Sequence, residues 1–382
     1  MAEQRRILAL PLNVSEQWIA GAYYIFNIIK ALNLLDDREK PFIVILAPDE
    51  SNFELAKKET SYPYLSYTKT GYANDTIPGF FNRVSSKLLN RKIFVRRISV
   101  PIDVLYPAWQ NKEVTNAKKK IFWIPDFQEH YLPGFFPEEE IAERKRSQRY
   151  IADNAEHLIL SSEDARKDFQ KFYPDHKCRV DVLPFAVSNS FEEGKDIRQV
   201  LGKYKINAEY IFIANQMWMH KNNLCVLEAV KILKNEGVEL MFVFSGSTND
   251  YRSAGYFQTV LEKVKELGIE KNVKFLGFID REDQLMLMKR AMFLVQPSLF
   301  EGWSTVVEDA KSLNQHIIVS DLEVHKEQLV AYPHLQFDRT SSLNLAEKIR
   351  IMLGQKDERI SYDYELQLKK FAKAIVEKFS LS

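Results

Sequence analysis

The stretch from Val295 to Ser320 is the most informative part of the sequence: it reads VQPSLFEGWSTVVEDAKSLNQHIIVS. Its opening apolar residues suit the end of a buried strand, and the pattern after Thr305 suits a helix. The loop between them holds Glu301, Gly302, Trp303, Ser304 and Thr305. Free backbone N–H groups and the positive end of a helix dipole favour anions, so we expect a diphosphate over Ser304 and Thr305. Glu308, one helical turn further on, can accept both hydroxyls of a ribose.

A plainer interpretation fits the same residues. A buried strand, a turn and an amphipathic helix need no ligand, and Glu301 and Glu308 would then be ordinary acids near a helix N-terminus. On the residues alone, the two interpretations stand level.

Strand patterns and helical patterns alternate on both sides of this stretch. Strands are expected at residues 7–12, 42–47, 104–106, 121–124, 157–160, 180–183, 210–214, 240–245, 273–276, 293–296 and 315–319. Helices are expected between them, among others at 22–35, 224–235, 256–267 and 281–291. This alternation predicts an α/β protein with two doubly wound parallel sheets. Residues 61–79, rich in Tyr, Pro and Gly, are expected to form an irregular loop, and 188–207 to link the two halves.

The length of the chain, 382 residues with 46% hydrophobic, fits two cores better than one. We expect one domain over 1–190, a second over 205–355 and an amphipathic C-terminal helix within 356–382. No run of about 20 apolar residues predicts a membrane span, and the N-terminus is interpreted as a first strand and not a signal peptide. Cys178 and Cys225 lie far apart without ligand spacing, which argues against a zinc site or a disulfide framework. A reducing cytoplasm is the expected location.

Basic residues gather between Arg83 and Lys120, where ten Lys or Arg and two acidic residues give +8, against +1 for the whole chain. Apolar residues such as Phe80 and Phe94 are interleaved with them. Two interpretations stay open: peripheral contact with the inner membrane surface, or a solvated helix packed on the first domain, which we favour. No nucleic-acid-binding motif is present, so no nucleic-acid partner is expected.

The stretch 295–320 resembles the signature of retaining glycosyltransferases of the GT-B fold, in particular family four. That signature reads P-S-x-x-E-G followed by a second Glu in an E-A-like pair. Its places are filled here by Pro297, Ser298, Glu301, Gly302, Glu308 and Asp309. In the family seven residues separate the two Glu, whereas six separate Glu301 from Glu308, so the turn is expected to be one residue tighter. The resemblance implies two Rossmann-like domains facing across a cleft, with the acceptor on the first, the nucleotide-sugar donor on the second, and a C-terminal helix crossing back to the first.

The loop after the strand at 210–214 reads NQMWMHKNN. Family members carry an Arg here and, six residues later, a Lys that grip the donor diphosphate. Lys221 fits the Lys, whereas Asn215 occupies the Arg position. The resemblance therefore assigns the diphosphate to Lys221 and backbone amides, helped by Gln216 or His220.

Two loops of the first domain complete the predicted site. Related enzymes often read His-Asp after the strand at 121–124, near the donor sugar or the acceptor; here Pro125 replaces the His and Asp126 is kept. His130 is the alternative source of an imidazole. Gly21 permits close backbone approach at a helix start, where the family keeps Gly near the donor phosphate.

The resemblance implies a retaining, metal-independent hexosyltransferase. Glu301 would hold hydroxyls of the donor sugar, and Lys221 would stabilise the departing nucleoside diphosphate, whose phosphate helps to accept the proton. No Asp-x-Asp follows a strand to hold a metal, and no cofactor is expected beyond the donor. The acceptor is expected to be a glycan or lipid-linked glycan of a cell-surface polysaccharide such as lipopolysaccharide. A small soluble acceptor, or an inactive nucleotide-sugar-binding scaffold, is the alternative.

Overall fold

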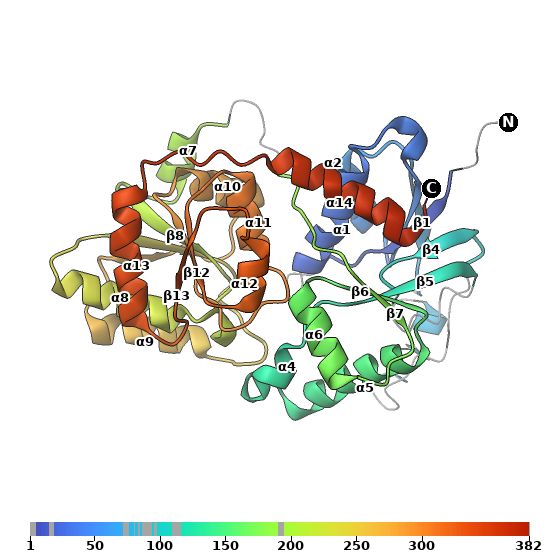
Figure 1. Cartoon of the computed structure of the whole chain (residues 1–382), viewed down its shortest axis with the longest axis horizontal. Coiled ribbons are helices and arrows are strands. Elements are labelled where there is room, and N and C mark those ends of the chain that lie inside the picture. Colours follow the sequence, from blue (N-terminus) through green and yellow to red (C-terminus); the bar gives the residue numbers. More distant parts are fainter. Residues whose placement is uncertain are drawn as a thin grey trace.

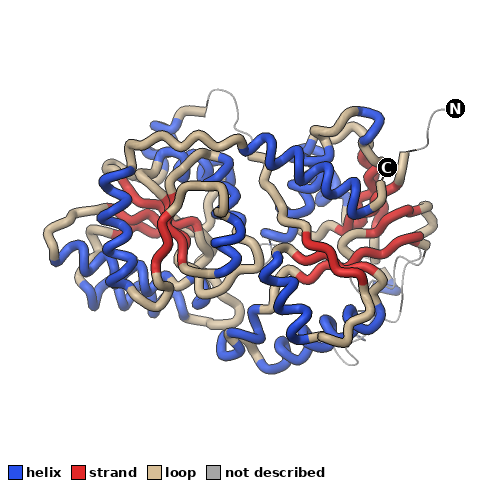
Figure 2. The backbone as a smooth tube through the Cα atoms, in the orientation of Figure 1, coloured by secondary structure: helices blue, strands red, loops and turns tan. Residues whose placement is uncertain are grey.

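The structure is a computed structural model. It describes residues 5–14, 19–71, 76–79, 81, 82, 85, 94, 98–108, 116–189 and 195–381. Two parallel sheets organise these residues, one in each half of the chain, and helices cover both faces of each sheet (Figure 1, Figure 2).

The first sheet has seven strands within the described residues, in the order β3-β2-β1-β4-β5-β6-β7, and all pairs are parallel. Its strands are β1 (Ile7–Pro11), β2 (Phe42–Ala47), β3 (Leu65–Lys69), β4 (Ile102–Leu105), β5 (Ala117–Ile124), β6 (His157–Leu160) and β7 (Arg179–Val182). Its helices are α1 (Ile19–Leu32), α2 (Glu50–Thr60), α4 (Gln128–Tyr131), α5 (Glu138–Asn154) and α6 (Glu163–Phe172). The N-terminus of α6 is capped by Ser162, whose Oγ accepts a hydrogen bond from the N–H of Ala165.

The second sheet has six strands within the described residues, in the order β10-β9-β8-β11-β12-β13, again all parallel. Its strands are β8 (Tyr210–Ala214), β9 (Met241–Ser245), β10 (Val273–Phe275), β11 (Leu294–Gln296), β12 (Ile317–Ser320) and β13 (Leu335–Phe337). Its helices are α7 (Ile197–Lys203), α8 (Asn223–Asn235), α9 (Tyr256–Leu267), α10 (Arg281–Arg290), α11 (Thr305–Ser312), α12 (Glu323–Gln328) and α13 (Ser342–Gln355).

Both sheets follow the doubly wound order. The first three strands are added toward one edge of the sheet, and the fourth strand then lies on the other side of the first. The switch points lie between β1 and β4 in one sheet and between β8 and β11 in the other. The predicted α/β fold with two Rossmann-like domains is therefore confirmed.

The last helix, α14 (Tyr364–Phe379), returns from the second domain and lies along α1 of the first (Figure 1). Its apolar residues Phe371, Ile375 and Phe379 share one core with β1 and α1. This explains why α1, with the sequence IAGAYYIFNIIKAL, is apolar almost all round: the sheet covers one face and α14 the other.

Three local expectations were wrong. The stretch 61–79 is not wholly irregular, because residues 65–69 form the edge strand β3 along β2. The segment 188–207 contains the helix α7, which packs on α10. The first helix starts at Ile19 and not at 22, so Gly21 lies inside its first turn.

No described helix is long and apolar enough to cross a membrane. Seven of the ten basic residues between 83 and 120 lie outside the described part of the chain, which includes only Lys118, Lys119 and Lys120 of that set. Lys118 pairs with Asp103 at 2.8 Å, and Lys119 Nζ lies 3.3 Å from the carbonyl oxygen of Lys378, near the end of α14. These two lysines thus have structural partners, and membrane contact by the basic stretch stays a prediction.

Candidate active site

A cleft of about 900 Å³ lies between the two domains. It is formed by loops that follow β8, β9, β10 and β11 of the second sheet and β5 of the first, so it lies at the carboxyl ends of strands. Most of the predicted site residues line it: Asp126, Asn215, Gln216, Lys221, Glu301, Gly302, Trp303, Ser304 and Thr305.

An ion pair joins Lys221 and Glu301 in the cleft. Lys221 Nζ lies 2.6 Å from Oε1 of Glu301, and the two side chains are only 17% and 10% exposed. Burial alone would raise the pKa of Glu301, but Lys221 and the hydroxyl of Ser298 outweigh burial and bring the pKa below its usual value. Glu301 is therefore an anion at neutral pH. No described residue donates a hydrogen bond to its Oε2, which leaves that oxygen for the hydroxyls of a ligand.

Asn215 belongs to the same hydrogen-bonded chain. Its Nδ2 donates to Oε1 of Gln296 at 2.8 Å, which turns Nε2 of Gln296 toward Oε1 of Glu301, also at 2.8 Å. Asn215 is buried. It thus helps to orient Glu301 and brings no positive charge to the cleft.

The start of α11 has unpaired hydrogen-bond donors. Thr305 and Val306 have backbone N–H groups that donate to no described acceptor, as the first turn of a helix requires. The N–H of Ser304 instead donates to Oε1 of Gln328 at 3.2 Å, and its buried hydroxyl has no partner among the described residues. An anion here can therefore use the N–H groups of Thr305 and Val306 with the hydroxyl of Ser304, a different set from the expected N–H groups of Ser304 and Thr305.

The loop before α11 reaches the first domain. A Cβ atom on Gly302 would lie 2.2 Å from the carbonyl oxygen of Pro125 and 2.9 Å from Cβ of Asp126. Beside it, Trp303 Nε1 donates to the carbonyl oxygen of Phe185 at 3.0 Å. Only glycine fits at position 302 with the domains this close.

Glu308 is not brought to the cleft. Its carboxylate is fully buried and accepts hydrogen bonds from Lys311, Gln328, Tyr364 and Gln367. Asp309 lines the cleft instead, one helical turn beyond Thr305. Asp309 is also the residue separated from Glu301 by seven others, so the family's usual spacing, applied strictly, would have found it.

His130 and Gly21 do not line the cleft either. The imidazole of His130 stacks on Phe172 with ring centroids 3.9 Å apart, and its Nε2 lies 3.3 Å from Oε1 of Gln148. Gly21 is buried in the first turn of α1. His130 and Gly21 are thus held by contacts within the first domain, and these contacts could not be predicted from the sequence.

Three arginines that line the cleft were not predicted from the sequence: Arg144, Arg252 and Arg281. Arg252 is sandwiched between Trp218 and Phe136, 4.4 and 4.8 Å from their ring centroids. It lies 3.3 Å from Nδ1 of His220, whose pKa is held well below 6.5 by burial and by the neighbouring cations. A single Arg outside any motif carries no pattern, so no sequence signal distinguished these residues.

No group of three His, Cys, Asp or Glu side chains in the described part of the chain could hold a metal ion.

The chain is similar in sequence and in fold to known glycosyltransferases. Residues 195–369 match the family model described as glycosyl transferases group 1. The chain is 24% identical to O-antigen chain mannosyltransferase B of Escherichia coli over 275 residues, 65% of this chain and 71% of that protein. It is 26% identical over 173 residues to the Escherichia coli UDP-Gal:alpha-D-GlcNAc-diphosphoundecaprenol alpha-1,3-galactosyltransferase, 43% of this chain and 42% of that one. The crystal structure of Anabaena Alr3699/HepE in complex with UDP and glucose is similar, with a TM-score of 0.66 and 15% identity over 99% of this chain and 100% of that chain.

Proposed function

Since the protein is a GT-B glycosyltransferase of the family-four-like group, we propose that it transfers a hexose with retention and without a metal ion. The donor is a nucleotide-diphosphate sugar, and the acceptor is a glycan or lipid-linked glycan of cell-surface polysaccharide synthesis. The Lys221–Glu301 pair beside the open first turn of α11 carries this proposal.

Each group of that site has one task in the proposed reaction. The diphosphate binds the N–H groups of Thr305 and Val306 and the hydroxyl of Ser304. Lys221 stabilises the charge that develops on the leaving diphosphate. The free Oε2 of Glu301 binds hydroxyls of the hexose and holds its anomeric carbon beside the cleft wall of the first domain.

Asp309 takes the ribose in this proposal, in place of Glu308. It lines the cleft one turn beyond the diphosphate site, whereas the carboxylate of Glu308 is hydrogen-bonded to Lys311 of the same helix and to residues of α12 and α14. Asp126, which lines the cleft from the first domain, is the proposed contact for the acceptor or the sugar. The acceptor attacks from the face that the diphosphate leaves, and a phosphate oxygen takes the proton of its hydroxyl.

A thermal-shift screen with UDP-, GDP-, ADP- and dTDP-sugars, each with Mg²⁺ or EDTA, tests the donor. A ligand at about 100 times its dissociation constant stabilises the folded state by about 2.7 kcal/mol. Stabilisation by one nucleotide family, equal in EDTA, is expected. A response that needs Mg²⁺ would contradict the metal-independent part alone.

Two variants test the chemistry once the donor is known. Lys221→Ala should lower kcat by about 10²- to 10³-fold, and Glu301→Gln should lower kcat while leaving nucleotide affinity within about threefold. Lys326→Ala, which removes an exposed lysine paired with Glu323, is the control. Normal turnover in Lys221→Ala or Glu301→Gln would contradict the proposed roles.

The second candidate function is a nucleotide-sugar-binding scaffold without turnover. The uncharged Asn215 at the family's Arg position favours it, because one cation of the diphosphate grip is missing. Binding of a donor without transfer, and without its slow hydrolysis, would support this alternative. A small soluble acceptor remains the other possibility for an active enzyme, and acceptor screens distinguish it.

A further inference from the structure

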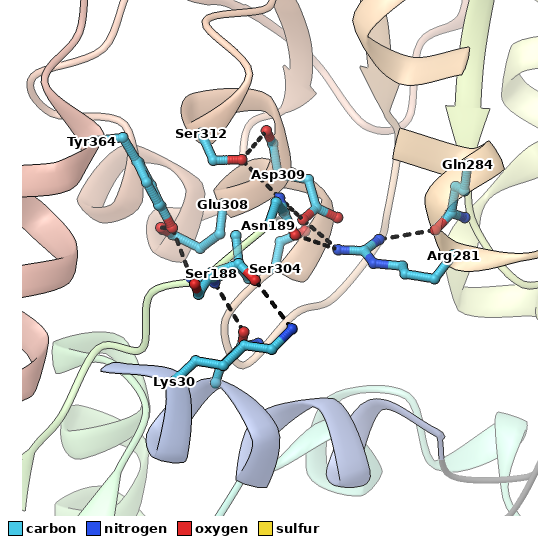
Figure 3. Close-up of polar contacts among 12 residues, drawn as sticks. Lys30, Ser188, Asn189, Arg281, Gln284, Ser304, Glu308, Asp309, Ser312 and Tyr364 are labelled. Atoms are coloured by element: carbon cyan, nitrogen blue, oxygen red, sulfur yellow. Dashed lines mark hydrogen bonds and ion pairs between the residues drawn. The ribbon is translucent and has the colours of Figure 1, made fainter. Parts of the chain in front are cut away.

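Asp309 is held from two directions by residues outside its own helix (Figure 3). Arg281, at the start of α10, lies 2.5 Å from its Oδ1. Asn189, in the segment between the domains, donates from Nδ2 to the same oxygen at 3.0 Å. Among the described residues no donor contacts Oδ2 of Asp309. Oδ1 is therefore hydrogen-bonded within the protein, whereas Oδ2 can accept a hydrogen bond from a ligand.

Arg281 is itself firmly placed. Its Nη1 donates to Oε1 of Gln284 at 2.9 Å, and its Nη2 also lies 3.3 Å from Oδ1 of Asn189. Burial lowers the pKa of Arg281, but the contact with Asp309 more than offsets this, so the guanidinium stays charged. Arg281, Asn189 and Asp309 thus form a closed triangle of polar contacts at the edge of the cleft.

The segment that carries Asn189 is fixed by the helices of the first domain and by α14. The N–H of Val187 donates to Oη of Tyr364 at 2.8 Å, and that of Ser188 to Oδ1 of Asn27 at 2.9 Å. Lys30 Nζ lies 3.5 Å from the carbonyl oxygen of Ser188 (Figure 3). The contact between Asn189 and Asp309 is therefore a direct bond between the interdomain segment and a residue of the cleft.

We propose that Asn189 and Arg281 are positioning residues for the nucleotide: they hold Oδ1 of Asp309 so that Oδ2 faces the ribose diol. This inference rests on the proposed function, because it needs a ribonucleotide in the cleft. A carboxylate held on one oxygen has its other oxygen fixed in direction, which lowers the ordering cost of the hydrogen bonds that this oxygen accepts from the two hydroxyls. Affinity for the ribose then depends on a residue of the interdomain segment, although Asn189 itself does not line the cleft.

The test compares ribose-dependent affinity in the full-length protein. Binding of UDP and GDP, and of their 2′,3′-dideoxy counterparts, is measured by calorimetry for the unchanged protein and for Asn189→Ala and Asn189→Asp. Ser312→Ala is the matched control, because it removes the other acceptor of Asn189 Nδ2, at 2.8 Å, and leaves Asp309 in place. Melting temperatures check that each variant is folded.

Asn189→Ala should weaken the ribonucleotide that binds by about three- to tenfold and the dideoxynucleotide by less than about twofold, since one contact between charged and neutral groups is lost. Asn189→Asp should weaken the ribonucleotide further, because two carboxylates would then face each other. Ser312→Ala should bind both like the unchanged protein.

Equal losses for both nucleotides in Asn189→Ala would overturn the inference, because a general structural role does not discriminate ribose from dideoxyribose. Unchanged affinity in Asn189→Ala would overturn it too. If the unchanged protein binds neither UDP nor GDP, nor any donor of the thermal screen, the proposed function itself fails, which is a separate result.

Discussion

At the scale of single residues, Glu308 and Asp309 are neighbours with different tasks. Glu308 is fully buried against Lys311, which is itself almost fully buried, and its two oxygens accept four hydrogen bonds. Glu308→Gln leaves the ammonium of Lys311 without its anion, so the free energy of unfolding should fall by about 3 kcal/mol in urea titrations. Affinity of the folded protein for the nucleotide that stabilises it in the thermal-shift screen should stay within about threefold.

Glu323→Gln provides a matched control for that change. Glu323 pairs with Lys326 at the same spacing along a helix, but both side chains are about half exposed or more. The loss should therefore stay below about 1 kcal/mol. A Glu308→Gln protein of normal stability that no longer binds the ribose would reverse the roles given to the two acids.

At the scale of elements, α14 is a part of the first core. Phe379 is fully buried, and its ring centroid lies 4.5 Å from that of Tyr106. Phe379→Ala should lower the free energy of unfolding by about 3–5 kcal/mol, which calorimetry should detect as an earlier melting of the first domain. Leu366→Ala on the same helix, at a residue that is 49% exposed, should change little. Equal effects of the two changes would contradict the packing of α14 described above.

Elements with a strong pattern could be predicted from the sequence. The apolar runs of β8 and β12 are fully or almost fully buried, so their residues alone marked them as strands. β3 could not be predicted in this way, because all five of its residues are only half-buried and its pairing with β2 decides its structure. Short strands such as β13 depend in the same way on neighbours far away in the chain.

The candidate site was predictable where a motif fixed it. The loop from Glu301 to Thr305 lines the cleft, as the signature indicated, and so does Lys221 of the loop after β8. Asp309 was missed because the second acid of the signature was assigned to Glu308, although the family's spacing of seven residues ends at Asp309. The packing of α12 and α14 on Glu308 shows which of the two adjacent acids faces the cleft. Arg281 and Asn189 were missed because they reach Asp309 only through the folded chain.

At the scale of the whole molecule, Gly302 sets how closely the domains approach. Gly302→Ala places a methyl group 2.2 Å from the carbonyl oxygen of Pro125, so the domains must separate. A displacement of about 1 Å can cost up to about 10²-fold in rate. We expect a lower kcat, a larger radius of gyration in X-ray scattering, and affinity for the nucleotide of the donor within about threefold of that of the unchanged protein. Gly202→Ala, where an added Cβ meets nothing within 4 Å, is the control; unchanged kcat in Gly302→Ala would contradict a closed catalytic state.

Stability of the whole molecule should depend on pH through buried histidines. Burial lowers the pKa of His157, His220 and His325 below 6.5. The unfolded chain then binds protons that the folded chain does not, so the free energy of unfolding falls as the pH drops below 6.5. Each of the three can contribute up to about 1.4 kcal/mol per pH unit.

Urea titrations between about pH 7.5 and 5.5 measure this slope. His220→Gln should reduce the slope of the free energy of unfolding against pH, by an amount that corresponds to at most one bound proton. Burial raises the pKa of Asp164, Asp168 and Glu327, whose protonation acts in the opposite sense at the acidic end of the range. A slope that is the same in His220→Gln would show that His220 is not buried in its neutral form.

The return of α14 to the first domain has a consequence for how the protein is made. The second sheet and its helices occupy one continuous stretch of chain, whereas the core of the first domain includes residues up to Leu381. On a ribosome, the second domain can therefore complete its core before the domain that precedes it in the sequence. The core of the first domain stays incomplete, with the apolar outer face of α1 uncovered, until α14 has been synthesised. A nascent chain stalled shortly after α13 should thus be the species that chaperones bind most.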